Sequence, residues 1–415
     1  MRLLHVADRF GWTAGGGDRY LEEILDPLRQ RGIENVVVYR DGNPARVTLA
    51  NRAVEIADLM QFTGQVPRAL ARLEQVMRET RPDAALVYCL PNPGFGMALV
   101  DALPTILVAQ DYGAVCPAAT QWWRLQNAAC DHTVGPACLV HAYTKGCYTR
   151  RPLPLVSAYR HVVASRAWLQ RAQFLAISAF VKHRFMAAGY RDEQIHVLRY
   201  PFAAEVAPPP APAERVEPTV LFVGRVSREK GLPHVLQALD QIPHRRWRLL
   251  VAGDGPEVPD CRLLASRLGL EAQVEFAGWL SGTALEAAFA ASALVVVASL
   301  WPEPYGQVGP QAMVRGRPVV AYASGAIPEW LIHGETGLSV APGDIRGLSL
   351  ALGELLADAR RRDAMGERAR AWVLETLTWD RHLSGLERII AHAIRTHCPD
   401  RPTLRESYEA ERCLW

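Results

Sequence analysis

The chain has 415 residues, too many for one hydrophobic core, so the length predicts two domains of ordinary size. Apolar residues make up 49% and charged residues 21%, the balance of a globular enzyme rather than of a fibrous or disordered protein. The net charge of +3 gives no reason to expect a nucleic-acid partner, and the longest apolar run, 293–299, is too short to span a bilayer. The amino-terminal residues resemble a first strand rather than a signal peptide, so we expect a cytoplasmic protein.

In the first half of the chain, short β-rich runs alternate with helical patterns. This alternation predicts a parallel sheet flanked by helices. The runs are 2–8, 35–40, 84–89, 105–110 and 173–178.

A glycine-rich turn, AGGGDRY at 14–20, follows the first of these runs and opens a helix. Glycines such as Gly16 and Gly17 let the backbone approach a phosphate or a sugar closely. The turn is not a dinucleotide fingerprint, because Tyr20 occupies the last glycine position. An NAD-dependent oxidoreductase is therefore disfavoured.

A cysteine-rich insert is expected at 116–147. It offers soft ligands for a tetrahedral zinc site, although their spacing is irregular and matches no zinc ribbon. Buried thiols or a disulfide are the alternatives, and Trp122 and Trp123 suggest a platform for an acceptor sugar or lipid. The zinc ligands would be drawn from Cys116, Cys130, Cys138, His141 and Cys147.

Residues 145–200 carry ten Lys or Arg residues against only Asp192 and Glu193. Such a segment favours an anionic acceptor or an anionic membrane surface. An ordinary solvated helix face explains it equally well.

A Pro-rich stretch at 204–218 interrupts the alternation and predicts an interdomain linker. The alternation then restarts in a second α/β domain at 219–380. An amphipathic segment, 379–396, predicts a helix that leads the tail at 381–415 back to the first domain. The predicted strands of the second half are 219–225, 246–253, 274–278, 293–299 and 318–322.

Two turns of the second domain carry candidate phosphate ligands. Arg225 and Lys230 lie in GRVSREKG at 224–231, after the domain's first strand. Two cations near one strand end suit a diphosphate, although two surface cations would look the same. A tight GDGP turn beginning at Gly253 is weaker evidence.

The segment WPEPYGQVGPQAMVRG at 301–316 follows a buried strand. Its carboxylate, Glu303, is suited to accept hydrogen bonds from sugar hydroxyls. A helix is predicted to begin near Pro310, with Gln311 in its first turn. Gly306 and Gly309 leave backbone amides accessible between them.

Together these motifs resemble the GT-B glycosyltransferases of family 4, also called group 1, which are retaining and use nucleotide sugars. The resemblance covers nearly the whole chain in the right order. It implies two doubly wound Rossmann-like α/β domains facing across a cleft, with residues 1–203 on the acceptor side. It also implies transfer of a hexosyl group to a polysaccharide, glycolipid or other glycoconjugate.

The resemblance assigns roles to individual residues. Arg225 and Lys230 match the cations that hold the donor diphosphate, and Glu303 matches the glutamate that binds hydroxyls of the transferred sugar. Position 311 matches a glutamate that grips the nucleotide ribose. The other substrate-binding positions that it implies are Gly16, Gly17, Gln110, Asp111, Gly253, Tyr305, Gly306, Gln307 and Val308.

The chain departs from the family at two positions. Gln311 replaces the second glutamate, and Gln110 stands where many relatives carry histidine before Asp111. An amide at 311 keeps a hydrogen bond but loses its charge-assisted part, at a cost of ~1–2 kcal/mol of donor affinity. A catalytically silent GT-B homologue that acts as a binding or regulatory partner is therefore the alternative function.

The implied partners are a UDP-, GDP- or ADP-linked sugar and a glycan or lipid-linked acceptor. No cofactor beyond the nucleotide-sugar donor and no catalytic divalent metal are expected. The implied location is cytoplasmic, peripheral on the inner face of the plasma membrane.

Overall fold

The computed structural model describes residues 1–11, 16–43, 49–60, 66–202, 217–244 and 246–397. The chain divides into two compact units. Unit 1 comprises residues 1–121, 131–199 and the chain from 382, and unit 2 comprises 122–130 and 200–381. Most of the predicted linker, 204–216, lies outside the described residues, as do positions 14 and 15 of the glycine-rich turn and the tail from 398.

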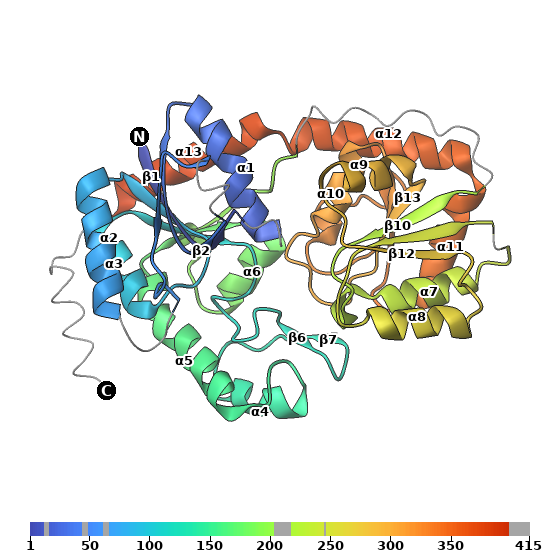
Figure 1. Cartoon of the computed structure of the whole chain (residues 1–415), viewed down its shortest axis with the longest axis horizontal. Coiled ribbons are helices and arrows are strands. Elements are labelled where there is room, and N and C mark those ends of the chain that lie inside the picture. The colour runs from blue at the N-terminus through green and yellow to red at the C-terminus, as the bar shows by residue number, and fades with distance from the viewer. Residues whose placement is uncertain (12–15, 44–48, 61–65, 203–216, 245, 398–415) are drawn as a thin grey trace. The chain divides into compact units, whose positions relative to one another are not determined.

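Unit 1 is built on a seven-stranded parallel sheet of order β3-β2-β1-β4-β5-β8-β9 (Figure 1). Its strands are β1 (Arg2–Phe10), β2 (Glu34–Gly42), β3 (Arg52–Glu55), β4 (Ala84–Val87), β5 (Thr105–Ala109), β8 (Gln173–Ala176) and β9 (Ile195–Val197). Its helices are α1 (Gly16–Gln30), α2 (Val66–Thr80), α3 (Pro93–Ala102), α4 (Ala137–Thr144), α5 (Pro152–Leu169) and α6 (Ala179–Ala187), with a 3-10 turn η2 (Asp192–Gln194).

Unit 2 contains a six-stranded parallel sheet of order β12-β11-β10-β13-β14-β15. Its strands are β10 (Thr219–Val223), β11 (Arg248–Ala252), β12 (Val274–Gly278), β13 (Leu294–Val297), β14 (Val319–Tyr322) and β15 (Gly337–Val340). Its helices are α7 (Leu232–Asp240), α8 (Val258–Arg267), α9 (Gly282–Ala291), α10 (Val308–Val314), α11 (Ile345–Ala357) and α12 (Ala359–Thr376), with 3-10 turns η3 (Arg228–Lys230) and η4 (Ile327–Glu329).

Two elements lie at the borders of the units. Helix α13 (Trp379–Thr396) begins in unit 2, and its residues from His382 belong to unit 1. The short hairpin of β6 (Trp122–Trp123) and β7 (Ala128–Ala129) interrupts unit 1 in sequence and is part of unit 2.

Central strands of both sheets are apolar throughout because helices cover both of their faces. All four residues of β4 (AALV) and of β13 (LVVV) are buried. Each predicted run in both halves forms a strand, which confirms the α/β class. The short strands β3, β9 and β15 were not predicted, since three or four residues give little periodicity.

The helix predicted to begin near Pro310 begins two residues earlier. Helix α10 starts at Val308, after Gly306 turns the chain with φ 77° and Gln307 caps the helix. Pro310 is therefore the third residue of α10 rather than the first, a position that still lies within the turn whose N–H groups have no helical partner. The prediction failed because the sequence shows the proline but not the turn that precedes it.

Candidate functional site

Lys230 lies beyond the carboxyl end of β10, on the short turn η3. The turn ends at Gly231, whose φ of 70° is left-handed and whose Cα lies so near Ala298 that a Cβ would come within 2.1 Å of its carbonyl oxygen. The N–H of Leu300 donates to the carbonyl of Glu229 (2.8 Å). The turn is thereby fixed against the segment that follows β13, the strand paired with β10.

Glu303 comes from that segment after β13, and it is only 4% exposed. Its carbonyl accepts from the N–H of Ala326 (2.8 Å). Gly325 packs against its backbone so closely that a Cβ there would lie 2.2 Å from the Glu303 oxygen. Three neighbouring strand ends, those of β10, β13 and β14, therefore hold Lys230 and Glu303 at one edge of the sheet.

The Lys230 ammonium forms an ion pair with Glu303 Oε1, which also accepts a hydrogen bond from Ser299 Oγ (2.6 Å). The same ammonium lies 5.2 Å from the centre of the Trp301 ring, within cation–π range. Burial alone would raise the pKa of Glu303. The charge of Lys230 and hydrogen bonds from Lys230, Ser299 and Trp301 outweigh burial and hold the pKa below its usual value.

Trp330 orders the loop after Glu303. It is fully buried, and its indole N–H donates to the carbonyl of Tyr305 (2.6 Å). Its ring lies against Gly309, where a Cβ would come within 1.9 Å of a ring carbon. The predicted donor-binding backbone at 305–308 is thus held by a packed tryptophan, with Tyr305 buried and 306–308 half-buried.

Arg225 and Gln311 differ from Lys230 in having no internal partner. Arg225 is exposed and Gln311 half-buried, and neither side chain forms a hydrogen bond or ion pair within the described part of the chain. In the backbone, the Gln311 carbonyl accepts from Arg315 Nη1 (2.6 Å). Both side chains therefore keep their hydrogen-bonding groups available for a ligand.

Gly253 has a packing role in the structure. It directly follows β11, and a Cβ at this position would lie 1.8 Å from the carbonyl oxygen of Gly224. The glycine thus lets the turn after β11 approach the turn after β10, where Val226 N–H donates to the Asp254 carbonyl (2.8 Å).

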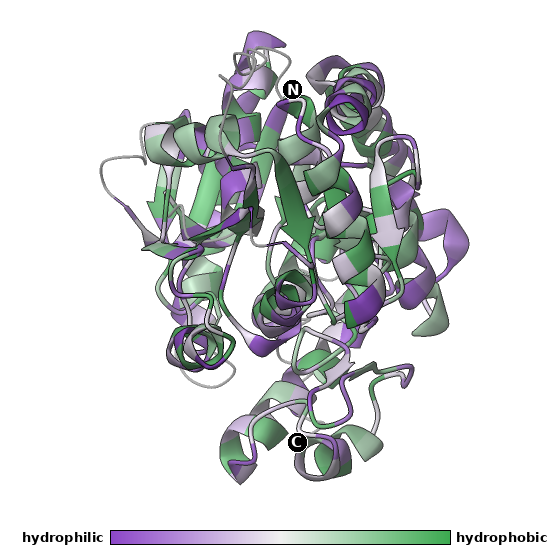
Figure 2. Cartoon of the chain, turned by 90° about the vertical axis from the view of Figure 1, so that its right-hand side faces the viewer, coloured by the Kyte–Doolittle hydropathy of each residue, from purple (hydrophilic) through white to green (hydrophobic). Residues whose placement is uncertain are grey.

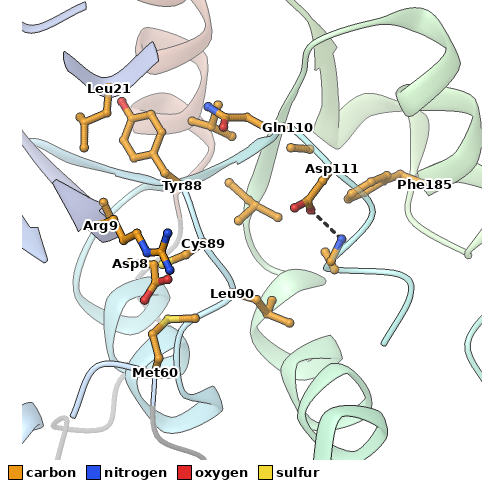
Figure 3. Close-up of a pocket in the computed structure, with 16 residues that line it drawn as sticks. Asp8, Arg9, Leu21, Met60, Tyr88, Cys89, Leu90, Gln110, Asp111 and Phe185 are labelled. Atoms are coloured by element: carbon orange, nitrogen blue, oxygen red, sulfur yellow. Dashed lines mark hydrogen bonds between the residues drawn. The ribbon is translucent and has the colours of Figure 1, made fainter. Parts of the chain in front are cut away.

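Unit 1 has a cavity of about 330 Å³ at the carboxyl ends of β1, β4 and β5 (Figure 3). Polar groups in its wall include Asp8, which accepts from Arg40 Nε (2.5 Å), and Arg9. Leu90 and Phe185 are among its apolar wall residues. No sequence motif marks these four residues, although the carboxyl ends of parallel strands are where ligands bind in such sheets.

Gln110 and Asp111, both predicted to bind substrate, lie in the wall of this cavity. Gln110 Nε2 is buried and has no hydrogen-bond partner among the described residues. Asp111 is exposed as a residue, but its carboxyl group borders the cavity. Burial there raises its pKa, although Gly113 N–H donates to Oδ1 (2.7 Å, dashed in Figure 3) and opposes the shift.

The structure describes only part of the glycine-rich turn. Gly16 and Gly17 are the first two residues of α1, while 12–15 lie outside the described residues.

The four cysteines of the insert are half-buried thiols in the structure. Across the described ranges, which include all of 116–147, no group of three or more His, Cys, Asp or Glu side chains is arranged to hold a metal ion. His141 instead packs against His132, with ring centres 4.7 Å apart. The suggested zinc site therefore gains no support.

None of the helices in the described ranges is long and apolar enough to cross a membrane.

The fold, with two units that each contain a doubly wound parallel sheet, is that of the GT-B glycosyltransferases. A crystal structure of Anabaena Alr3699/HepE in complex with UDP superimposes with a TM-score of 0.73 at 20% identity, covering 94% of this chain and 100% of that one. Residues 208–372 match the family described as "Glycosyl transferases group 1". The resemblance seen in the sequence is confirmed for that region, which contains Arg225, Lys230, Glu303 and Gln311.

The relatives agree with this class. The chain is 33% identical over 170 residues to the GDP-mannose-dependent alpha-(1-6)-phosphatidylinositol monomannoside mannosyltransferase of Mycolicibacterium smegmatis, covering 39% of this chain and 44% of that protein. It is 26% identical over 383 residues to the lipopolysaccharide core biosynthesis glycosyltransferase LpsD of Rhizobium meliloti, covering 91% and 93%. The chain spans half or less of the length of the curated relatives that it matches at 30% identity or more.

Proposed function

We propose that the chain is a retaining glycosyltransferase that moves a hexosyl group from a nucleotide-diphosphate sugar to a glycan or lipid-linked acceptor. One observation carries the proposal. Within a region that matches group 1 glycosyltransferases, the half-buried Lys230 and the buried Glu303 form an ion pair at the carboxyl edge of a parallel sheet. Ligands bind at this edge in doubly wound folds.

The pair is suited to a leaving diphosphate. A lysine ammonium has three N–H donors, and Glu303 accepts from one of them, so the others are available for phosphate oxygens. Glu303 and Trp301 hold the ammonium in place before the donor arrives, which is the preorganisation that electrostatic catalysis needs. Arg225, which is exposed and unpaired, supplies the second positive charge.

Glu303 also keeps capacity for a sugar. A carboxylate has about four acceptor positions, the bonds from Lys230 and Ser299 both end on Oε1, and the bond from Trp301 still leaves a position unfilled. Oε2 is therefore placed to accept from a hydroxyl of the transferred sugar, and Gln311 is proposed to contact the nucleotide ribose. Two protein cations beside the diphosphate make a catalytic divalent metal unnecessary, so transfer should persist in excess chelator.

The cavity of unit 1 is the proposed acceptor site. Asp111 and Gln110 offer an acceptor and an unused donor to a hydroxyl, beside apolar wall residues that suit a sugar ring or a lipid-linked carrier. The relatives named for phosphatidylinositol monomannoside and for lipopolysaccharide core favour an acceptor joined to a lipid. We accordingly place the enzyme in the cytoplasm, peripheral on the membrane that carries the acceptor.

A donor screen tests the proposal. Solved structures similar in fold are bound to UDP and UDP-glucose, whereas the mycobacterial relative is named for GDP-mannose, so both bases belong in the screen, with ADP- and dTDP-sugars. The true donor should raise the melting temperature, and Lys230→Ala should abolish that rise. The anomeric configuration of the product, read by NMR, then tests retention. A donor that stabilises the protein but yields neither transfer nor hydrolysis would indicate a silent homologue.

A further inference from the structure

The outward faces of α4 and α5 in unit 1 are apolar. Helix α5 has 18 residues, of which only Arg160 and Arg166 are charged, and it buries one face through Leu155, Val162 and Trp168. A helix packed on one side normally turns polar residues to solvent. In Figure 2 much of the helical ribbon at the lower end of the picture is green, the apolar end of the scale, with paler and purple segments between.

The exposed side chains on this face are large. Leu153 is 85% exposed and Val156 is 41% exposed, one helical turn further along α5. On the neighbouring α4, Val140 is 60% and Tyr143 44% exposed. Single apolar residues on a surface are ordinary, but four on two packed helices leave an apolar patch that a partner would cover.

Two exposed arginines join the apolar residues. Arg150 and Arg151 lie between α4 and α5, and Arg150 Nη2 donates to the carbonyl of Tyr143 (3.4 Å). We call the set the α4–α5 surface. It consists of Val140, Tyr143, Arg150, Arg151, Leu153 and Val156.

The charge around this surface is one-sided. From 132 to 191 the chain has nine Lys or Arg residues and no Asp or Glu. In the structure these nine residues fall into two groups, because the four from Arg171 onward form ion pairs with carboxylates. These ion pairs are Arg171–Asp101, Lys182–Asp192, Arg184–Asp131 and Arg191–Glu193.

The basic residues between positions 145 and 166 therefore give the region around the α4–α5 surface a positive charge. We propose that this surface docks on an anionic lipid surface, with Leu153, Val156 and Val140 entering the headgroup layer while Arg150 and Arg151 contact lipid phosphates. Apolar residues beside basic ones are the pattern of interfacial helices, and an aromatic residue such as Tyr143 favours the same depth.

A second copy of the chain is a poor occupant, because it would bring like charges together. The inference rests on the proposed peripheral location and names the part of the chain responsible for it.

Co-sedimentation of the full chain with vesicles tests the proposal without requiring glycosyl transfer. Phosphatidylcholine vesicles containing phosphatidylglycerol should bind the protein, and pure phosphatidylcholine vesicles should bind it much more weakly. Arg150→Gln with Arg151→Gln should weaken binding about 25-fold, since each basic residue near an anionic surface contributes ~1 kcal/mol. Leu153→Ser should weaken it on the order of ten-fold through the lost apolar contact.

Matched controls lie in unit 2. Leu350→Ser removes a leucine that is 67% exposed, and Arg346→Gln with Arg360→Gln removes two exposed arginines, so both should bind vesicles like the wild type. Equal binding by the control and α4–α5 variants would overturn the proposal, as would wild-type protein that stays in the supernatant at low salt. A dimer in solution that Leu153→Ser dissociates, without vesicle binding, would assign the surface to a second copy. The donor-induced rise in melting temperature should be the same in all variants, which separates this proposal from the proposed activity.

Discussion

Each unit has a buried polar centre beside its proposed site, and the two centres are built differently. In unit 2 the centre is charged, with Lys230 and Glu303 paired and Ser299 donating to the carboxylate. In unit 1 it is neutral. His5, fully buried in β1, lies 3.0 Å from the Tyr88 hydroxyl through Nδ1 and 3.0 Å from Asn35 Oδ1 through Nε2.

The partners of the buried histidines fix their tautomers. Asn35 uses its amide nitrogen to donate to the Leu25 carbonyl, so its Oδ1 must accept a hydrogen bond from His5 Nε2. His5 Nδ1 then accepts from Tyr88, a residue of the cavity wall. His382 likewise donates from Nδ1 to the Arg199 carbonyl (2.8 Å) and accepts from the Tyr20 hydroxyl (2.7 Å). A proton gained by either histidine would reverse its bond with the tyrosine, because the hydroxyls of Tyr88 and Tyr20 donate to the neutral rings.

Because one centre is neutral and the other charged, acid acts on them over different pH ranges. Burial lowers the pKa of His5 from 6.5 to about 4, although the bond to Asn35 opposes the shift, and burial lowers that of His382 to about 4 as well. The unfolded chain takes up these protons first, so unit 1 loses stability as the pH falls from 6.5 to 4. The lowered pKa of Glu303 acts over a more acidic range. The stability that ionised Glu303 contributes is complete above the ordinary carboxyl pKa and is lost only as the pH falls below it.

Lys230→Ala should change activity more than any other substitution proposed for these two centres. Turnover should fall roughly 100- to 1,000-fold, because one preorganised charge partner of the diphosphate is removed. The variant should also unfold more easily, by about 2 kcal/mol, because Glu303 is left as a buried carboxylate without its cation. Steady-state kinetics and chemical denaturation measure the two effects.

A second variant separates the two effects. In Lys230→Met with Glu303→Gln both charges are gone, so stability should recover while turnover stays low. Arg225→Ala is the matched control, because its exposed side chain has no internal partner. It should lose turnover to a similar degree without losing stability. Near-wild-type transfer by Lys230→Ala and Arg225→Ala would remove the diphosphate from this site.

Much of unit 2 could be predicted from the sequence because its chemistry is local. Lys230 lies in a turn with flanking glycines, and Glu303 follows a buried strand, so both could be placed at strand ends. Their pairing could not be predicted, because they are 73 positions apart and meet only through the register of β10 and β13. Ser299, four residues before Glu303, was missed, although a serine directly after a buried strand is a signal that could have suggested it.

The strands of unit 1 could be predicted, but most of its candidate site could not, for the same physical reason. Tyr20 and His382 are 362 positions apart, so no local pattern joins them. Most of the cavity wall comes from three strand ends that share no motif, with Leu21 and Phe185 added by α1 and α6, and only Gln110 and Asp111 were anticipated. The basic segment was recognised from its composition, but the carboxylates that pair with its second half include Asp101, 70 positions away.

The next effect in size concerns the neutral centre. As the pH falls from 6.5 to about 4, protonation linked to His5 should lower the free energy of unfolding by about 3 kcal/mol. This value follows from the difference between the ordinary pKa of histidine and the lowered pKa of His5 in the fold. His5→Gln has no proton to gain, so its stability should fall less over this range. Denaturant titrations at several pH values measure the slope, and exposed His183→Gln should keep the wild-type slope. Parallel curves for His5→Gln and the wild type would mean that His5 is not the acid-sensitive group.

Substitutions at position 311 should have a smaller effect, and they test whether the charged centre of unit 2 is complete. Gln311 stands where the family resemblance expects a second carboxylate, and its side chain has no partner within the described ranges. If it contacts the ribose, Gln311→Glu adds a charge-assisted bond and should hold or tighten donor binding, whereas Gln311→Ala should weaken it by ~1–2 kcal/mol. Neither change should alter stability much, because the side chain stabilises nothing else in the fold.

Calorimetric titration with the donor found in the screen measures both variants, and equal affinities in all three proteins would place position 311 outside the site. The direction of the Gln311→Glu change is the informative part: weaker binding would show that the site excludes a second carboxylate, so that the amide is an adaptation to a different nucleotide rather than a loss.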